Sequence, residues 1–130
     1  MLPHSQPIIP SPRCRVRSVE QRLVVVGGAD NTDEVSNQLK VFNPELTAYT
    51  LLPNMTTGVH SHCICVLNNF LYVIGGQRSF EERGKTATDE VARFDPRFNT
   101  WMKIAPMNEK RAGFSVTVIP SFNRIYGWFG

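Results

Sequence analysis

The sequence has little cysteine, and its three cysteines do not form the pattern of a disulfide framework. The count is odd, and Cys63 and Cys65 stand two residues apart in an apolar run. In such a run, cysteine acts as a small hydrophobic residue, a pattern that is typical of proteins in a reducing compartment. No apolar run reaches the length of about 18 residues that a transmembrane helix needs. The early prolines interrupt any secretory signal: Pro3, Pro7, Pro10 and Pro12. We therefore predict a cytoplasmic protein with no membrane partner.

The sequence also lacks a basic region of the kind that binds nucleic acid. The net charge is +3, and residues 1–22 account for it, because there Glu20 alone opposes four arginines: Arg13, Arg15, Arg17 and Arg22. Over the rest of the chain, basic and acidic side chains balance. A nucleic-acid interface needs Lys and Arg clustered on the folded part, so we predict no nucleic-acid partner. We expect the Pro-rich residues 1–12 to form a disordered leader.

Motifs for catalysis, phosphate binding and calcium binding are absent. Neither Gly27–Gly28 nor Gly75–Gly76 is followed by Gly-Lys-Ser/Thr, and no serine stands in Gly-x-Ser-x-Gly. The acidic residues Asp30, Asp33 and Glu34 lack the alternating spacing of an EF-hand loop. We therefore predict no catalytic residue, no enzyme activity and no cofactor.

A zinc site is the one metal hypothesis that the sequence raises, because His60, His62, Cys63 and Cys65 lie close together. On a strand, successive side chains point to opposite faces. The two histidines would then share one face and the two cysteines the other, so one strand does not bring all four to a single ion. We predict a buried strand with small thiols and no metal.

What the sequence does contain is an internal repeat. The segment Leu23–Gly28 recurs 48 residues later as Leu71–Gly76, and Val41–Pro44 recurs 52 residues later as Arg93–Pro96. Two single residues match at the same shift of 52, Tyr49 with Trp101 and Met55 with Met107, and a third unit begins at Arg111–Val118 and runs into Ile125–Gly130. The chain is therefore built from copies of one structural unit.

Each unit reads as short strands separated by turns, with no helical period. In the second unit we expect strands over 62–67, 70–74, 90–95 and 100–104, with a hairpin turn at Asn68–Asn69 and a surface loop over 77–89. We expect the first unit's inner strand at residues 15–19. A single four-stranded sheet cannot cover its own two faces, so such units must stack. Tyr49 and Trp101 are the expected large anchors between adjacent sheets.

The same order of features occurs twice, over roughly residues 13–119. In each copy, an apolar strand leads into Gly-Gly and is followed by a Phe-Asp/Asn-Pro turn, an aromatic residue and then a methionine. This order resembles the kelch motif, whose structural residues match Gly27, Gly28, Tyr49, Gly75, Gly76 and Trp101. The resemblance implies an all-β, incomplete kelch β-propeller of about two and a half four-stranded antiparallel blades. We expect kelch repeat 1 at 13–55, repeat 2 at 56–107 and a truncated repeat 3 at 108–130.

An open stack would expose apolar sheet faces, so we expect marginal stability and aggregation.

The resemblance is to the kelch-like (BTB–kelch) family and implies a protein-interaction module, the substrate-recognition part of an adaptor for a cullin-3 ubiquitin ligase. Contact with cullin-3 would run only through a BTB region, and nothing in this sequence resembles BTB or BACK. Two alternatives remain open, an actin-binding kelch module and a truncated product without function of its own. The partner is thus expected to be a protein substrate or actin.

Partner contacts are expected on the loops of one propeller face, because rigid scaffolds usually bind through such loops. The loop over 77–89 offers an aromatic ring between cations, Phe80 with Arg78 and Arg83. The equivalent loop of the first unit, 29–38, contributes Asn31. His60 and His62 are expected to face the central channel.

Overall fold

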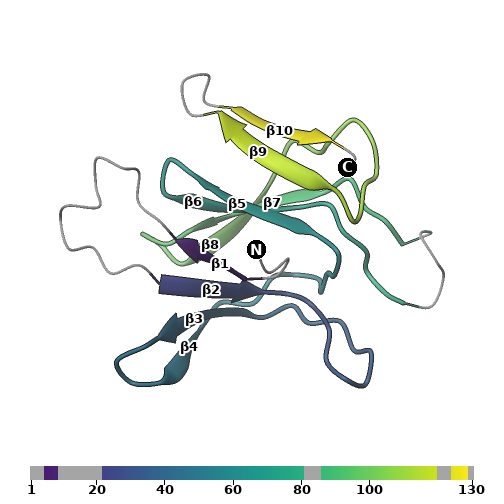
Figure 1. The fold of residues 1–130 in the computed structure, drawn as a ribbon. Helices are drawn as coiled ribbons and strands as arrows, with labels where there is room; N and C mark the ends of the chain where they lie inside the picture. Colours follow the sequence, from purple (N-terminus) through teal and green to yellow (C-terminus); the bar gives the residue numbers. More distant parts are fainter. Residues whose placement is uncertain (1–4, 9–21, 81–85, 120–123, 129–130) are drawn as a thin grey trace.

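The computed structural model describes residues 5–8, 22–80, 86–119 and 124–128, and this part of the chain contains strands and loops but no helix. Its strands form three antiparallel sheets (Figure 1). The first sheet is β1 (Ser5–Ile8), β2 (Arg22–Val26), β3 (Leu39–Asn43) and β4 (Ala48–Leu52). The second is β5 (Cys63–Leu67), β6 (Phe70–Ile74), β7 (Val91–Asp95) and β8 (Thr100–Ile104), and the third pairs β9 (Ser115–Ile119) with β10 (Arg124–Trp128). The all-β expectation of about two and a half antiparallel blades is confirmed.

The second sheet shows how the sequence sets the strand ends. Asn68 and Asn69 have φ angles of 53° and 66°, which is the left-handed pair that a tight two-residue hairpin requires and that asparagine tolerates. This turn pairs Leu67 with Phe70 and, at the far end of the hairpin, Cys63 with Ile74. The hairpin predicted at these two asparagines is therefore confirmed.

The two double-glycine segments lie in matching surroundings. In both Gly27–Gly28 and Gly75–Gly76 the first glycine has a φ of 62°, and the second has 87° and 95° respectively. The second glycine donates its N–H over 2.8 Å to the next unit, to the carbonyl oxygen of Val59 in one case and of Arg111 in the other. A Cβ on the first glycine would lie only 2.6 or 2.5 Å from these same two oxygens. The repeat seen in the sequence is thus a repeat of backbone geometry.

The methionine that closes each motif is held in the same way in both units. The N–H of Met55 donates to the carbonyl oxygen of Asn37, and that of Met107 to the carbonyl oxygen of Asp89, both over 2.8 Å. Each bond fastens the chain leaving a sheet to the loop between that sheet's second and third strands. The spacing of 52 residues between the methionines therefore reflects one shared fold.

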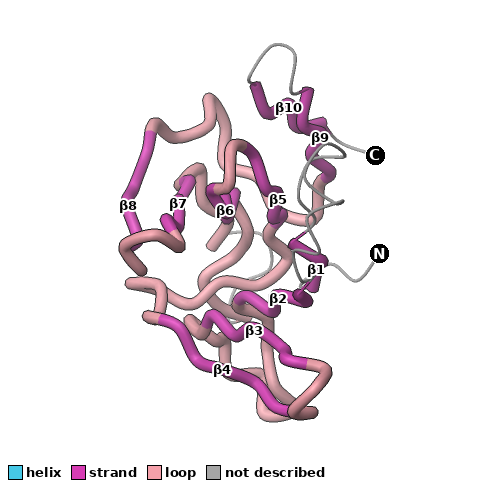
Figure 2. The backbone as a smooth tube through the Cα atoms, turned by 90° about the vertical axis from the view of Figure 1, so that its left-hand side faces the viewer, coloured by secondary structure: helices cyan, strands magenta, loops and turns pink. Residues whose placement is uncertain are grey.

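The sheets stack as successive layers, with β1–β4 on one side of β5–β8 and the β9–β10 pair on the other (Figures 1 and 2). Two apolar clusters fill the spaces between them. The first holds Val24, Val26, Leu39, Met55, Val59, Ile64, Leu71, Val73 and Phe94. The second holds Cys65, Ile74, Val91 and Phe114. Successive sheets thus bury the apolar faces that they turn towards each other, as the repeat requires.

The prediction of aromatic anchors between sheets holds for Trp101, whereas no described sheet packs on the face that carries Tyr49. Trp101 packs against the first cluster, and its Nε1–H donates over 2.7 Å to the carbonyl oxygen of Pro53 in the preceding unit. Tyr49 packs against Phe42 within its own sheet, with ring centroids 5.1 Å apart, and is 52% exposed. The reason is position: Tyr49 lies on the face of the first sheet that points away from the second sheet.

The start of the chain differs from the expected leader. Ser5–Ile8 forms β1 and pairs with β2, where residues 1–12 were expected to be disordered. Pro7 stands opposite Leu23 on this edge strand, and an edge is where a sheet tolerates a residue without an N–H. The inner strand expected at residues 15–19 lies outside the described residues.

Candidate functional site

A surface hollow of about 490 Å³ lies where the loops of two successive units meet. One wall comes from the loop between β2 and β3 and consists of Asp33, Glu34 and Val35. The other comes from the loop between β6 and β7 and consists of Arg78, Ser79 and Phe80. The sequence predicted that both loops lie on the same face, and in the structure residues of both line this hollow.

The acidic wall is held in shape by a turn centred on Asp30. Its carboxylate oxygen Oδ1 accepts hydrogen bonds from the N–H and hydroxyl of Thr32, over 2.8 and 2.6 Å, and from the N–H of Glu34, over 3.2 Å. These bonds favour the ionised form and lower the pKa of Asp30. Asn31, predicted as a contact residue, is exposed on this turn, but the hollow itself is lined by Asp33 and Glu34.

The aromatic wall is supported from beneath by His60. The His60 and Phe80 rings stack with centroids 3.9 Å apart and planes 10° apart. His60 Nε2 lies 3.1 Å from the carbonyl oxygen of Ser79, and Nδ1 lies 3.0 Å from Ser61 Oγ. Phe80 is 47% exposed although one of its ring faces is covered. The stack presents the free side of Phe80 to the surface in a fixed orientation.

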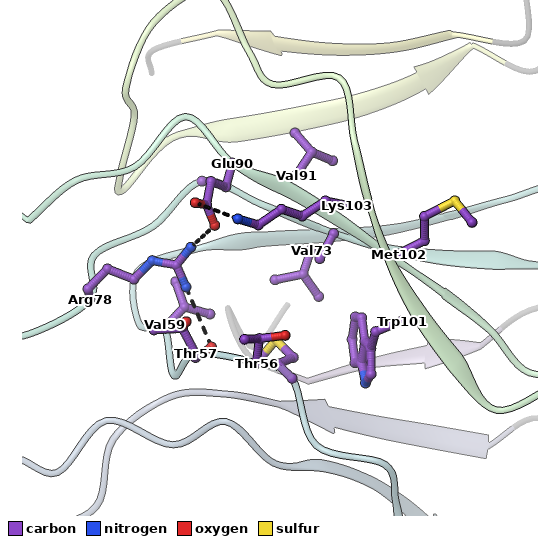
Figure 3. Close-up of a pocket in the computed structure, with 13 residues that line it drawn as sticks. Thr56, Thr57, Val59, Val73, Arg78, Glu90, Val91, Trp101, Met102 and Lys103 are labelled. Atoms are coloured by element: carbon purple, nitrogen blue, oxygen red, sulfur yellow. Dashed lines mark hydrogen bonds and ion pairs between the residues drawn. The ribbon is translucent and has the colours of Figure 1, made fainter.

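Arg78 connects the hollow with a second cavity between the first two sheets (Figure 3). It forms an ion pair with Glu90, which Lys103 also contacts through Nζ over 3.1 Å. Figure 3 shows these three charged groups at one side of the cavity and the ring of Trp101 at the other. The cavity has a volume of about 130 Å³ and an apolar floor that includes Met55, Val59 and Val73.

The sequence did not identify Glu90 and Lys103 as site residues, because their spacing does not indicate that they form ion pairs with each other and with Arg78. Glu90 precedes β7 and Lys103 lies on β8, so the register of two strands brings them together. The carboxylate of Glu90 balances the charges of Arg78 and Lys103 only in part, because two cations share this one anion. Arg78 is thus oriented by Glu90 while its side chain stays 27% exposed.

The two histidines, which were expected to face the central channel, are both buried in this structure. His60 is 8% and His62 is 3% exposed, and a Cβ added to Gly27 would lie 3.0 Å from His62 Cε1. His60 therefore acts on the surface only through Phe80, and His62 belongs to the packing around the double glycines. Arg83, the remaining predicted contact residue, lies outside the described residues.

The two cysteines face the third sheet within the second apolar cluster. Cys63 donates its thiol hydrogen to the carbonyl oxygen of Phe114 over 2.8 Å. Burial raises the pKa of Cys63 to about 11 and that of Cys65 to about 12, so both thiols are protonated near neutral pH. Within the described residues, no group of three or more His, Cys, Asp or Glu side chains is arranged to hold a metal ion.

Within the same described part of the chain, there is no helix with the length and apolar character needed to cross a membrane.

Comparison with known proteins supports the repeat seen in the structure. The kelch motif matches residues 59–108, and a second form of the motif matches residues 10–55. The chain is 40% identical over 94% of its length to kelch-like protein 13 of Mus musculus and 40% identical over 92% to kelch-like protein 9 of the same species. It is 37% identical over 91% to kelch-like protein 31 of Homo sapiens. The chain spans about a fifth of the length of these relatives.

Proposed function

Because this chain belongs to the kelch-repeat family and is similar to kelch-like proteins, we propose that its hollow between the two loops is the binding site for a protein partner. Kelch repeats of this kind form protein-interaction modules. The observation that carries the proposal is the meeting of Phe80 and Arg78 with Asp33 and Glu34 across the loops of two units. Aromatic and arginine side chains are the residues that most often dominate binding energy at interfaces.

The geometry of the hollow favours binding over chemistry. Phe80 is oriented by His60 and Arg78 by Glu90 before any partner arrives, and preorganised side chains lose less conformational entropy on binding. The acidic wall is likewise fixed by the Asp30 turn. A partner would therefore meet an aromatic and cationic wall opposite an acidic one, which selects for a segment carrying both charge signs.

We propose further that the partner is a substrate destined for ubiquitination, and that the intact protein presents it to a cullin-3 ligase in the cytoplasm. The family resemblance supports this role, since kelch-like proteins often serve as such receptors. Two free thiols, the half-buried Cys63 and the buried Cys65, fit a reducing compartment. In this mechanism the kelch repeats hold the substrate non-covalently, and the transfer reaction takes place on other subunits.

The binding proposal is tested by affinity purification of the tagged chain from cells, with Arg78→Ala and Phe80→Ala beside the wild type. A partner bound at the hollow should be recovered about tenfold less with either variant, because removing an interface anchor typically costs at least about 1–2 kcal/mol. Lys110→Ala is the control, since Lys110 is exposed and does not line the hollow. Recovery of the same partners by all four proteins would contradict the proposal.

The ubiquitination role is tested separately on any partner that depends on Arg78. Blocking cullin-3 should raise the level of that partner and lower its ubiquitination. If the partner does not respond, the adaptor role is wrong while the binding site stands. Co-sedimentation with actin filaments that is lost in Arg78→Ala would assign the same hollow to the cytoskeleton instead.

A further inference from the structure

A second cluster of aromatic and cationic side chains lies at the opposite end of the second sheet. Arg93 Cζ lies 4.3 Å and Arg97 Cζ 5.6 Å from the centroid of the Phe70 ring. Arg97 Cζ also lies 5.2 Å from the ring of Phe98. Both arginines belong to β7 or to the turn after it, and Phe70 begins β6 directly after the Asn68–Asn69 turn. We name Phe70, Arg93, Arg97 and Phe98 the arginine–phenylalanine patch.

The patch lies away from the hollow because of the direction of the strands. Leu67 and Phe70 pair at the turn end of the β5–β6 hairpin, whereas Cys63 and Ile74 pair at the end that leads into the hollow's loop. Asp95 and Thr100 pair beside the turn that carries Arg97 and Phe98. The two hairpin turns of the second sheet thus stand at the same end, opposite the loop of Arg78.

The patch has more positive than negative charge. Arg97 is bound by Asp95 in a two-point contact, Nε to Oδ1 over 3.1 Å and a terminal nitrogen to Oδ2 over 2.9 Å. Arg93 donates to the sulfur of Met102 over 3.5 Å and also acts electrostatically on Asp95, whose pKa it helps Arg97 to lower. Two guanidinium groups therefore face one carboxylate, which leaves donors on Arg93 for an added anion.

The first unit provides an internal control for the structural importance of the patch. At the repeat shift of 52 residues, Val41 stands for Arg93 and Glu45 for Arg97, while Arg22 stands for Phe70 at the shift of 48. The first sheet forms the same strands and register without any of these side chains. The fold therefore does not require the patch, in contrast to the double glycines, which both units share.

We propose that the arginine–phenylalanine patch binds an acidic peptide segment of a partner protein, independently of the hollow. The carboxylates of such a segment would accept hydrogen bonds from Arg93 and Arg97, whose planes are held in place by Phe70. Phe98 and Met102, which are 69% and 56% exposed, offer apolar contacts beside these cations. The fitting ligand therefore carries Asp or Glu side chains interspersed with apolar ones.

A protein segment fits the patch better than a nucleic acid does. Base stacking needs a free aromatic face, whereas Phe70 has two guanidinium groups over its ring. A phosphate backbone also needs several cations in a row, and here Asp95 stands between Arg93 and Arg97 in the sequence. The excess charge suits one or two carboxylates.

The test uses the whole chain and a fluorescein-labelled peptide of sequence Glu-Leu-Glu-Glu-Leu-Glu, with fluorescence anisotropy as the readout. Arg93→Ala and Arg97→Ala should each weaken binding of this peptide at least fivefold. The wild-type chain should bind the Gln-Leu-Gln-Gln-Leu-Gln peptide as weakly as an Arg93→Ala, Arg97→Ala double variant binds the acidic peptide. Phe70→Leu should weaken binding severalfold although it removes no charge, because the arginines lose the ring that supports them. Circular dichroism confirms that each variant remains folded.

Lys40→Ala is the matched control, because Lys40 Nζ also lies over an aromatic ring, 5.3 Å from the centroid of Tyr49 in the first unit. It should bind the acidic peptide like the wild type. The proposal is overturned if the peptide does not bind at millimolar concentration, if Lys40→Ala weakens binding as much as Arg97→Ala, or if single-stranded RNA binds the two arginines more tightly than the peptide. Binding of the peptide that depends on Arg78 would assign the acidic ligand to the hollow instead.

Discussion

The first glycine of each double-glycine segment combines two separate demands, a left-handed backbone and the absence of a side chain. Gly75 has a φ of 62°, and a Cβ there would lie 2.5 Å from the carbonyl oxygen of Arg111 and 2.9 Å from Met107 Cε. Gly113 has the same φ of 62° but no atom within 4 Å of its Cβ position. Comparing alanine substitutions at Gly113 and Gly75 therefore separates the cost of backbone strain from the cost of steric crowding.

We predict that Gly113→Ala lowers the free energy of unfolding by about 1–2 kcal/mol, the usual penalty of a left-handed alanine. Gly75→Ala should lose about 1–3 kcal/mol more, because the backbone carbonyl of Arg111 cannot move without breaking the link between units. Urea unfolding followed by tryptophan fluorescence measures both. Equal losses for the two variants would show that crowding at Gly75 is relieved at no cost.

The half-buried Cys63 and the buried Cys65 give a pH-dependent prediction. The folded pKa of Cys63, about 11, lies above its ordinary value of 9.0, so the folded state holds the proton more tightly than the unfolded state. This contribution to stability is full below pH 9 and is lost as the pH rises towards about 11. We expect the urea midpoint to fall over that range, and to fall less in a Cys63→Ser, Cys65→Ser variant.

Side-chain pairing is where the sequence predicted least. Arg78 and Phe80 were identified from residue type, but their supports Glu90, Lys103 and His60 depend on strand register and on side-chain rotamers. His62 was expected to face the central channel because alternation places it with His60, whereas the backbone at Ser61 between them has a φ of 55°. Alternation applies only within a regular strand, and β5 begins at Cys63.

At the scale of elements, each outer strand carries an aromatic residue whose role depends on the neighbouring sheet. Trp101 and Phe94 pack with centroids 5.1 Å apart and planes at 53°, and Tyr49 and Phe42 repeat this with 5.1 Å and 57°. Of the two, Trp101 also reaches the preceding unit, through its hydrogen bond to Pro53 directly after β4. The contact between the two aromatic rings thus follows from pairing of the strands within one sheet. The hydrogen bond from Trp101 to Pro53 follows from the stacking of one unit on the next.

We predict that Trp101→Phe lowers the free energy of unfolding by about 1 kcal/mol through the lost hydrogen bond, with further loss from the smaller ring. Tyr49→Phe, at the equivalent position, should change it by less than about 0.5 kcal/mol, because Tyr49 is 52% exposed and does not bridge two sheets. Thermal unfolding of the two variants compares them directly. A larger loss for Tyr49→Phe would contradict this account of the stack.

Strand positions were largely predictable because they follow from local chemistry. The expected strands at 70–74 and 100–104 are β6 and β8, and the others differ by one residue at their starts. The exception is β1, since four prolines within residues 1–12 favour an irregular leader. Pairing with an edge of β2 overrides that local preference over Ser5–Ile8.

At the scale of the whole molecule, the stability of a stack of sheets depends on the contacts between neighbouring sheets, and an uncovered face contributes none. The face of the first sheet that points away from the second presents Tyr49, 52% exposed, and Leu51, 60% exposed. In the second unit the positions equivalent to these are Trp101 and Lys103, which face the first sheet. The first sheet therefore offers a surface shaped to receive another sheet, and such a surface promotes association.

We predict that the chain associates in a concentration-dependent manner and that Leu51→Lys, which copies Lys103 onto the first unit, shifts it towards the monomer. Leu46→Lys is the control, because Leu46 is 72% exposed in the turn between β3 and β4 and lies outside both strands. Sedimentation velocity over a range of concentrations measures the change. If association runs through the sheet face, only Leu51→Lys relieves it, since a charge there must be desolvated against the incoming sheet. A monomeric wild type, or equal relief by both variants, would mean that the exposed face does not drive association.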